Sequence, residues 1–286
     1  MKKTALILEG GSFRTMFSAG VLDVFLENEI SFDYVIGVSA GALVAINYLS
    51  KQKGRVAYIN TKYNNDKRYI GLTNYFQSDG VINFDFLFEY LGNSDETPFD
   101  YNTFGNRSAD FEVVVTNCET GKAEYFLIND NKQEMIDITK ASGSLPLISK
   151  EINIDNVSYL DGGIADSIPI QHVLDLGFEK IVVILTQDRS FTKKSLSKSV
   201  ERLLRLKYRN YPSFLSTLKN RHFNYNNSLK TVHREKENGK VYLIQPDRPV
   251  KIEKIEKDKT KLESLYKSGL SSGAHHANHV KSFLKE

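Results

Sequence analysis

Ser39 stands in the stretch GVSAG, residues 37–41, where an apolar run changes its period. The residues before it have the β-branched and aromatic character of a buried strand, and those after it have the spacing of a packed helix. Gly37 and Gly41 would leave room for neighbouring backbone at such a turn, so the serine hydroxyl is exposed. The helix N-terminus beyond it favours developing negative charge. The pattern predicts a nucleophile.

A serine nucleophile also needs donors for an oxyanion. The turn EGGSFRT follows the first apolar run, residues 4–9. In a parallel sheet, neighbouring strand-to-helix turns open at the same edge, so we expect the backbone N–H groups of Gly11 and Ser12 to face Ser39. A phosphate-binding turn or a merely tight turn is the alternative, although GGSFRT does not match the full dinucleotide fingerprint.

The base is the third requirement. None of the six histidines follows a convincing strand, and we expect them to be surface or structural residues. Asp161, in YLDGGIADSIP, follows a short strand and precedes Gly162 and Gly163, which would let another backbone segment approach. An aspartate of an ordinary turn is the competing interpretation.

The three motifs occur in a recognisable order. A strand leading into Gly-Gly-x-x-Arg, then Gly-x-Ser-x-Gly, then Asp-Gly-Gly followed by SIPI resembles the patatin-like phospholipases over residues 4 to about 187. The segments LKNRHFNYNNSL and KVYLIQPDRP resemble the C-terminal extension of bacterial members of that family.

The resemblance implies a serine–aspartate dyad without histidine, in which Ser39 attacks an ester carbonyl and Asp161 accepts its proton. It implies an oxyanion loop, with Arg14 organising that loop or meeting substrate phosphate; the loop consists of Gly10, Gly11, Ser12 and Arg14. A lipid acyl hydrolase of the phospholipase A or lysophospholipase type is then the expected function. An aspartate is a weak base at its ordinary pKa, so its surroundings must change that pKa.

Two residues depart from the family pattern. Ser12 stands where a third glycine is usual, and a serine at positive φ is strained. Thr15 stands where many members have glycine. Both departures favour the alternative function, a catalytically weak or inactive lipid-binding or regulatory module on the same fold.

Short links between alternating strands and helices predict an α/β protein. We expect a three-layer α/β/α sandwich with a mostly parallel central sheet in residues 1–189, and a basic, mainly helical extension, residues 190–286, packed on it. Residues 53–104 are either a packed excursion or a flap over the site. The predicted strands are 4–9, 32–38, a hairpin at 111–128, a pair around 154–158, 180–186 and 240–246; the predicted helices include 15–29, 40–52, 132–142 and 168–177.

Charge is distributed unevenly. Residues 1–189 contain 16 Lys and Arg against 26 Asp and Glu, whereas residues 190–286 contain 22 against 9. The basic part suits a peripheral contact with an anionic membrane, and solvated helical faces are the simpler explanation. No motif for reading nucleic acid accompanies the charge.

The remaining composition points to a cytoplasmic protein, peripheral at the inner membrane face if it contacts lipid, because no apolar stretch approaches bilayer length. The single cysteine, Cys118, excludes a disulfide within the chain and is expected to be core. No cluster of potential ligands has metal-site spacing, so neither a metal nor another cofactor is expected. The sequence leaves the oligomeric state open.

Overall fold

The apolar runs near the N-terminus form the centre of a sheet. In the computed structural model, which describes residues 3–285, β1 (Thr4–Leu8) and β2 (Tyr34–Val38) are parallel neighbours, with Leu8 opposite Gly37. Every residue of β2 is buried, which explains why its sequence is continuously apolar rather than alternating. Both strands end at the loops that the sequence analysis singled out.

Within the described residues, eight strands form one mixed sheet in the order β5-β6-β3-β2-β1-β7-β8, with β4 paired to β3. The pairs from β3 through β8 are parallel, and those joining β4, β5 and β6 are antiparallel. The bounds of the remaining strands are β3 Asp110–Asn117, β4 Ala123–Leu127, β5 Ile152–Ile154, β6 Val157–Asp161, β7 Lys180–Ile184 and β8 Val241–Ile244.

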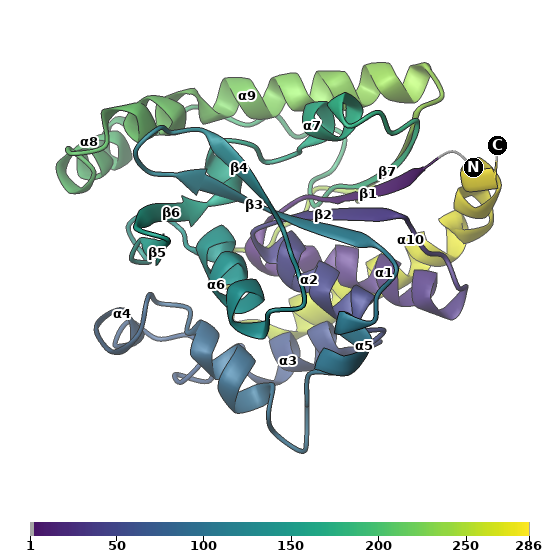
Figure 1. Cartoon of the computed structure of the whole chain (residues 1–286), viewed down its shortest axis with the longest axis horizontal. Helices are drawn as coiled ribbons and strands as arrows, with labels where there is room; N and C mark the ends of the chain where they lie inside the picture. The colour runs from purple at the N-terminus through teal and green to yellow at the C-terminus, as the bar shows by residue number, and fades with distance from the viewer. Residues whose placement is uncertain (1–2, 286) are drawn as a thin grey trace.

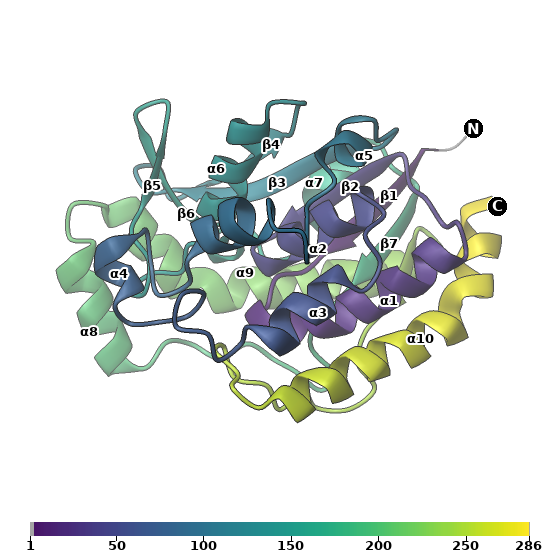
Figure 2. The same cartoon turned by 90° about the horizontal axis from the view of Figure 1, so that it is seen from below.

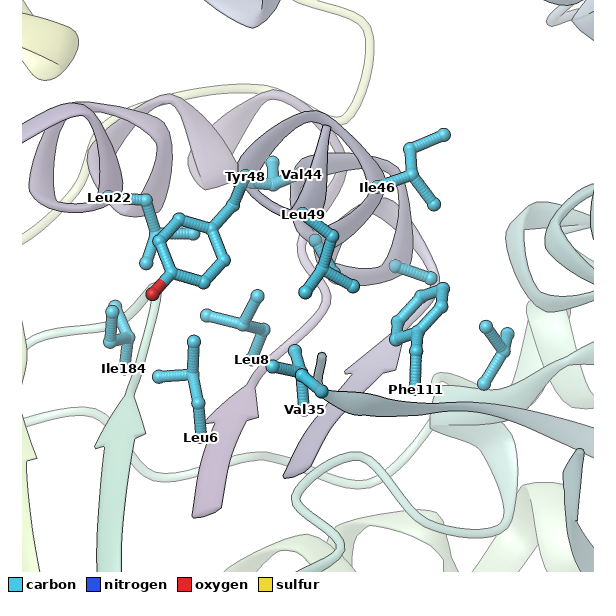
Figure 3. Close-up of a cluster of buried hydrophobic side chains, with 14 of the residues drawn as sticks. Leu6, Leu8, Leu22, Val35, Val44, Ile46, Tyr48, Leu49, Phe111 and Ile184 are labelled. Carbon is cyan, nitrogen blue, oxygen red and sulfur yellow. The ribbon is translucent and has the colours of Figure 1, made fainter. Parts of the chain in front are cut away.

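Helices cover both faces of this sheet (Figure 1). Leu6 and Leu8 of β1 point to one face and pack with helices α1 (Met16–Glu27) and α2 (Ala40–Leu49), as Figure 3 shows. Ala5 and Ile7 point to the other face and pack with residues of α7 (Ile170–Asp175) and α9 (Pro212–Glu237). Helix α6 (Lys132–Gly143) lies on the α2 side. The predicted three-layer α/β/α sandwich with a mostly parallel sheet is confirmed.

The C-terminal region is built into the same sandwich. After α8 (Lys198–Lys207) and α9, strand β8 adds to the sheet parallel to β7, and α10 (Lys259–Lys285) lies along α1 (Figure 2). The helices approach closely where two glycines meet. A Cβ on Gly269 would lie 2.1 Å from the carbonyl oxygen of Phe17, and one on Gly20 would lie 2.4 Å from that of Tyr266. The extension is helix-rich, and the boundary at residue 189 stays a prediction.

Residues 53–104 form a packed excursion. They contain α3 (Arg55–Lys62), α4 (Asn74–Gln77), a π-helical turn (Phe86–Leu91) and α5 (Tyr101–Gly105). A small buried cluster of its own holds the excursion together, including Tyr63, Tyr69, Phe86 and Leu91. Helices α3 and α5 of the excursion contact α2.

Candidate active site

Ser39 lies on the tight turn between β2 and α2. Its backbone has φ +56° and ψ −128°, a conformation that residues with a side chain rarely adopt. The flanking glycines are required by space. A Cβ on Gly37 would lie 2.5 Å from Cα of Ala42, and one on Gly41 would lie 2.5 Å from the carbonyl oxygen of Leu8. The turn therefore holds the serine in a strained backbone geometry of the kind used by nucleophiles, with the residue lining a cavity.

The hydroxyl of Ser39 donates a 2.5 Å hydrogen bond to Oδ2 of Asp161, although 122 residues separate them. Strand β3 explains the meeting. Val114 pairs with Val38, the residue before the serine, and the next residue, Val115, pairs with Asp161. Strands β2 and β6 thus end beside each other on β3, so that Ser39, which follows β2, and Asp161, which ends β6, direct their hydroxyl and carboxylate toward one point.

The two glycines after Asp161 fix the carboxylate. Oδ1 of Asp161 accepts a 2.8 Å hydrogen bond from the backbone N–H of Gly163. A Cβ on Gly162 would lie 2.0 Å from the carbonyl oxygen of Val114, so only glycine fits against β3 there. Burial raises the pKa of Asp161, against opposing contributions from Arg221, the hydrogen bonds from Ser39 and Gly163, and Lys254. A raised pKa makes this carboxylate a stronger base than a free aspartate.

The loop of Gly10, Gly11 and Ser12 lines the same cavity as Ser39 and Asp161. In the described chain, the N–H groups of Gly11 and Ser12 donate no hydrogen bond and so remain available. A Cβ on Gly10 would lie 2.9 Å from Cβ of Ser39, which shows how closely the loop approaches the serine. Ser12 has φ +49°, the conformation in which a serine is strained.

Ser142, at the end of α6, was not predicted from the sequence. Its hydroxyl accepts a 2.8 Å hydrogen bond from the N–H of Ser39 and donates a 2.6 Å bond to the carbonyl oxygen of Val114. The turn at Ser39 is thereby tied to β3. Nothing in the sequence distinguishes this serine from Ser144 two residues later.

Three cations that line the cavity of Ser39 were not predicted from the sequence either. Lys193, Arg221 and Lys254 line the cavity together with Arg14, although all three lie in the C-terminal region. Arg221, on α9, donates a 2.5 Å hydrogen bond from Nε to the carbonyl oxygen of Gly163. The basic C-terminal region therefore reaches the site, which neither the motif spacing nor the charge count indicated.

A second, largely apolar cavity meets this one at Ser12, Ser39 and Lys254. Its walls come from α2 and from the excursion at residues 53–104, and include Leu43, Ile59, Phe84, Leu87, Phe88 and Phe99. An extended apolar group bound there would have its polar end at Ser39.

The other chemically reactive residues lie elsewhere. His172 stacks on Tyr125 and bonds to Glu112 at 2.8 Å, and no histidine lines either cavity in the part of the chain that the structure describes. Cys118 is buried, and burial raises the pKa of its thiol to about 12. Across residues 3–285, no group of His, Cys, Asp and Glu has the arrangement of a metal site.

Comparison with known proteins agrees with the motifs. Residues 6–174 match the family described as Patatin-like phospholipase, and residues 211–285 match a domain of unknown function, DUF6363. An uncharacterized protein of Escherichia coli K12, YjjU, is 28% identical over 189 residues. That match covers 64% of this chain and 52% of the relative, so the chain matches only about half of the relative's length. VipD from Legionella pneumophila is similar over 99% of this chain and 67% of its own, with a TM-score of 0.48 and 12% identity.

Proposed function

The chain belongs to the patatin-like phospholipase family, and from this premise we propose that it hydrolyses carboxylic esters of lipids through a Ser39–Asp161 dyad. The observation that carries the proposal is the 2.5 Å hydrogen bond from Ser39 to Asp161, beside the free N–H groups of Gly11 and Ser12. A nucleophile, a base and oxyanion donors thus border one cavity.

In the proposed reaction, Ser39 Oγ attacks the ester carbonyl carbon while its proton passes to Oδ2 of Asp161. The N–H groups of Gly11 and Ser12 stabilise the negative charge on the former carbonyl oxygen. When the intermediate collapses, the C–O bond to the alcohol breaks and the departing oxygen takes the proton from Asp161. The acyl group is then held as an ester of Ser39.

Water completes the cycle by the same route. Asp161, again a carboxylate, accepts a proton from the water that attacks the acyl-serine carbonyl. Collapse of the second intermediate returns this proton to Ser39 Oγ and releases a fatty acid. The apolar cavity that ends at Ser39 would hold the acyl chain in both steps.

A lipid ester in a membrane must be reached from its surface. Leu72 and Phe76, beside and on α4, are 80% and 84% exposed, and Leu203 and Leu206 of α8 are 56% and 73% exposed. These segments lie at one end of the molecule (Figure 1), where Lys207 of α8 contacts Tyr75 of α4. We propose this end as a peripheral contact with anionic membrane. Among residues 3–285, no helix is both long and apolar enough to cross a bilayer.

Labelling with a fluorophosphonate probe, which reacts with activated serines, tests the proposal. We expect the native protein to be labelled and to hydrolyse a short-chain fatty ester, and Ser39→Ala to lose both properties. Ser199→Ala, an exposed serine on α8, is the matched control and is expected to behave as the native protein does. Absence of labelling in folded native protein contradicts the proposal.

Ser12 supports a second candidate, a lipid-binding module without turnover. Its positive φ places strain in the loop that would stabilise the oxyanion. This candidate predicts retention of a fluorescent fatty acid in the apolar cavity, with neither labelling nor ester hydrolysis. Active protein that labels only at Ser39 excludes it.

A further inference from the structure

Four cations border the cavity that contains Ser39: Arg14, Lys193, Arg221 and Lys254. They come from four separate segments of the chain, namely the first turn, the loop before α8, α9 and the loop before α10. Two carboxylates, Glu9 and Asp161, border the same space. The cavity therefore has an excess of two positive charges when all these groups are ionised.

The cations are not neutralised by ion pairs. Among the described residues, none of the four forms a salt bridge. Glu9, one of the two carboxylates that border the cavity, is already bonded to the N–H and hydroxyl of Thr186 and to the hydroxyl of Tyr225. Nε of Arg14 is buried and has no hydrogen-bond partner at all. Unpaired cations in a partly desolvated space are costly, and such arrangements occur where an anion binds.

Lys193 is held in place before any anion arrives. The backbone of Lys193 exchanges two hydrogen bonds with the side chain of Asn226 on α9, at 3.0 and 3.1 Å. Nζ of Lys193 lies 4.3 Å from the centroid of the Tyr225 ring. Burial and the charge of Arg221 lower the pKa of Lys193 to about 7, so an anion in the cavity would favour its protonated form.

The cationic cavity lies next to the apolar cavity, and Ser39 borders both. The apolar cavity and the cationic cavity share Ser12, Ser39 and Lys254. An ester with its acyl chain in the first cavity would place its alcohol portion in the second. We propose that the cationic cavity binds a phosphate monoester on the alcohol portion of the substrate, so that the preferred substrates are acyl esters of the 1-acylglycerol 3-phosphate class. This proposal rests on the proposed hydrolysis at Ser39.

Charge balance selects among head groups. A phosphate monoester carries close to two negative charges near neutral pH, which matches the excess of two positive charges. Its oxygens can accept hydrogen bonds from the two guanidinium groups and the two ammonium groups at once. A choline head group brings a quaternary ammonium into this space and is opposed by Lys193 and Arg221, and an uncharged alcohol leaves the cations unpaired.

The first test compares esters with one acyl chain and three head groups: 1-acylglycerol 3-phosphate, 1-acylglycerol and 1-acylglycerophosphocholine. We expect kcat/KM of the native protein to be at least about tenfold higher for the phosphate monoester, because charged hydrogen bonds contribute about 10- to 100-fold. Lys193→Met should lower the phosphate-to-uncharged ratio about tenfold. Lys194→Met, which removes an exposed neighbouring charge, should leave the ratio unchanged.

Lys254→Met is the second variant. Lys254 is an exposed loop residue, so the substitution removes little packing and the variant is expected to fold. It should lower the same ratio. An unchanged ratio in both Lys193→Met and Lys254→Met overturns the proposal, as does a native preference for the uncharged or choline ester.

Binding measurements separate this proposal from the hydrolysis on which it rests. Calorimetric titration of Ser39→Ala with glycerol 3-phosphate should show binding that Lys193→Met weakens about tenfold, even if no ester is hydrolysed. Equal hydrolysis of all three esters, with normal serine labelling, overturns the head-group proposal alone. Inorganic phosphate that binds Ser39→Ala as tightly as glycerol 3-phosphate does, without a preference for the phosphate ester, indicates a site for free phosphate and also overturns it.

Discussion

The hydroxyl of Thr15 donates a 2.7 Å hydrogen bond to the carbonyl oxygen of Ser12. These are the two residues that depart from the family pattern, and the structure shows that they are coupled. Ser12 is held at φ +49°, and Thr15, which is buried, bonds to the peptide that follows this strained residue. The pair offers a way to keep the proposed oxyanion loop ordered without a third glycine.

Thr15→Val tests this coupling, because valine keeps the shape and removes the hydroxyl. We expect the free energy of unfolding to fall by about 1–2 kcal/mol, since a partly buried carbonyl loses its partner. We also expect kcat to fall about tenfold with little change in KM, since only the oxyanion donors are displaced. Thr15→Ser keeps the hydroxyl and should have a kcat close to that of the native protein. A stability loss with native kcat would mean that Thr15 only supports the fold.

Asp161→Asn should separate activity from stability. It removes the proposed base, so kcat/KM is expected to fall by about 10²–10⁴. Burial raises the pKa of Asp161 in the folded protein, so the ionised carboxylate weakens the fold as pH rises through that pKa. Asparagine removes this cost. The midpoint of thermal unfolding at pH 8 should rise by about 2–4 °C for each kcal/mol gained in the free energy of unfolding. This rise should vanish at low pH, where Asp161 is protonated in the folded protein.

Ser39→Ala is the matched control for this stability effect. It removes a hydrogen bond to the carboxylate and leaves the buried charge, so its thermal midpoint at pH 8 should be unchanged or lower. A midpoint of Asp161→Asn below that of Ser39→Ala at pH 8 would contradict a raised pKa for Asp161.

The pH dependence of kcat/KM should report the same carboxylate. The proposed mechanism requires ionised Asp161, so kcat/KM should rise with pH through a value above the ordinary aspartate pKa. Arg221, Lys254 and the donors Ser39 and Gly163 favour the ionised form. Arg221→Gln should therefore move the acid limb to higher pH, and Arg221→Lys should move it less. Lys219→Gln, an exposed charge on the same helix, should leave it in place; an unmoved limb in Arg221→Gln would exclude Asp161 as the titrating group.

Within residues 4–187, part of the arrangement of the candidate site could be predicted from the sequence. Ser39 and the Gly10–Ser12 loop each follow one of two neighbouring parallel strands, β2 and β1, and the carboxyl ends of such strands meet at one edge, so the approach of the loop to the serine follows from strand order. The pairing of β6 with β3 was not predictable from periodicity, because the short antiparallel strand has no distinctive pattern. The contact between Ser39 and Asp161 was therefore predicted from the motifs and not from the order of the strands.

Lys193, Arg221 and Lys254 could not be predicted in the same way. Each lies in a basic segment where many lysines and arginines are exposed, and only tertiary packing distinguishes those that border the cavity. The C-terminal region is long enough to look like a separate unit, yet β8 joins the sheet and α10 packs against α1. Sequence patterns report local periodicity, and these contacts are set by long-range packing.

The glycine contact between α1 and α10 gives a final prediction. A Cβ on Gly269 would lie 2.1 Å from the carbonyl oxygen of Phe17, which is rigid backbone. Gly269→Ala should push the helices apart and lower the free energy of unfolding by about 1–3 kcal/mol, the usual cost of overpacking. Gly105→Ala is the matched control, because no atom lies within 4 Å of its added Cβ. Chemical denaturation of both variants measures the difference, and equal stability would show that α10 does not contribute to the fold through this contact.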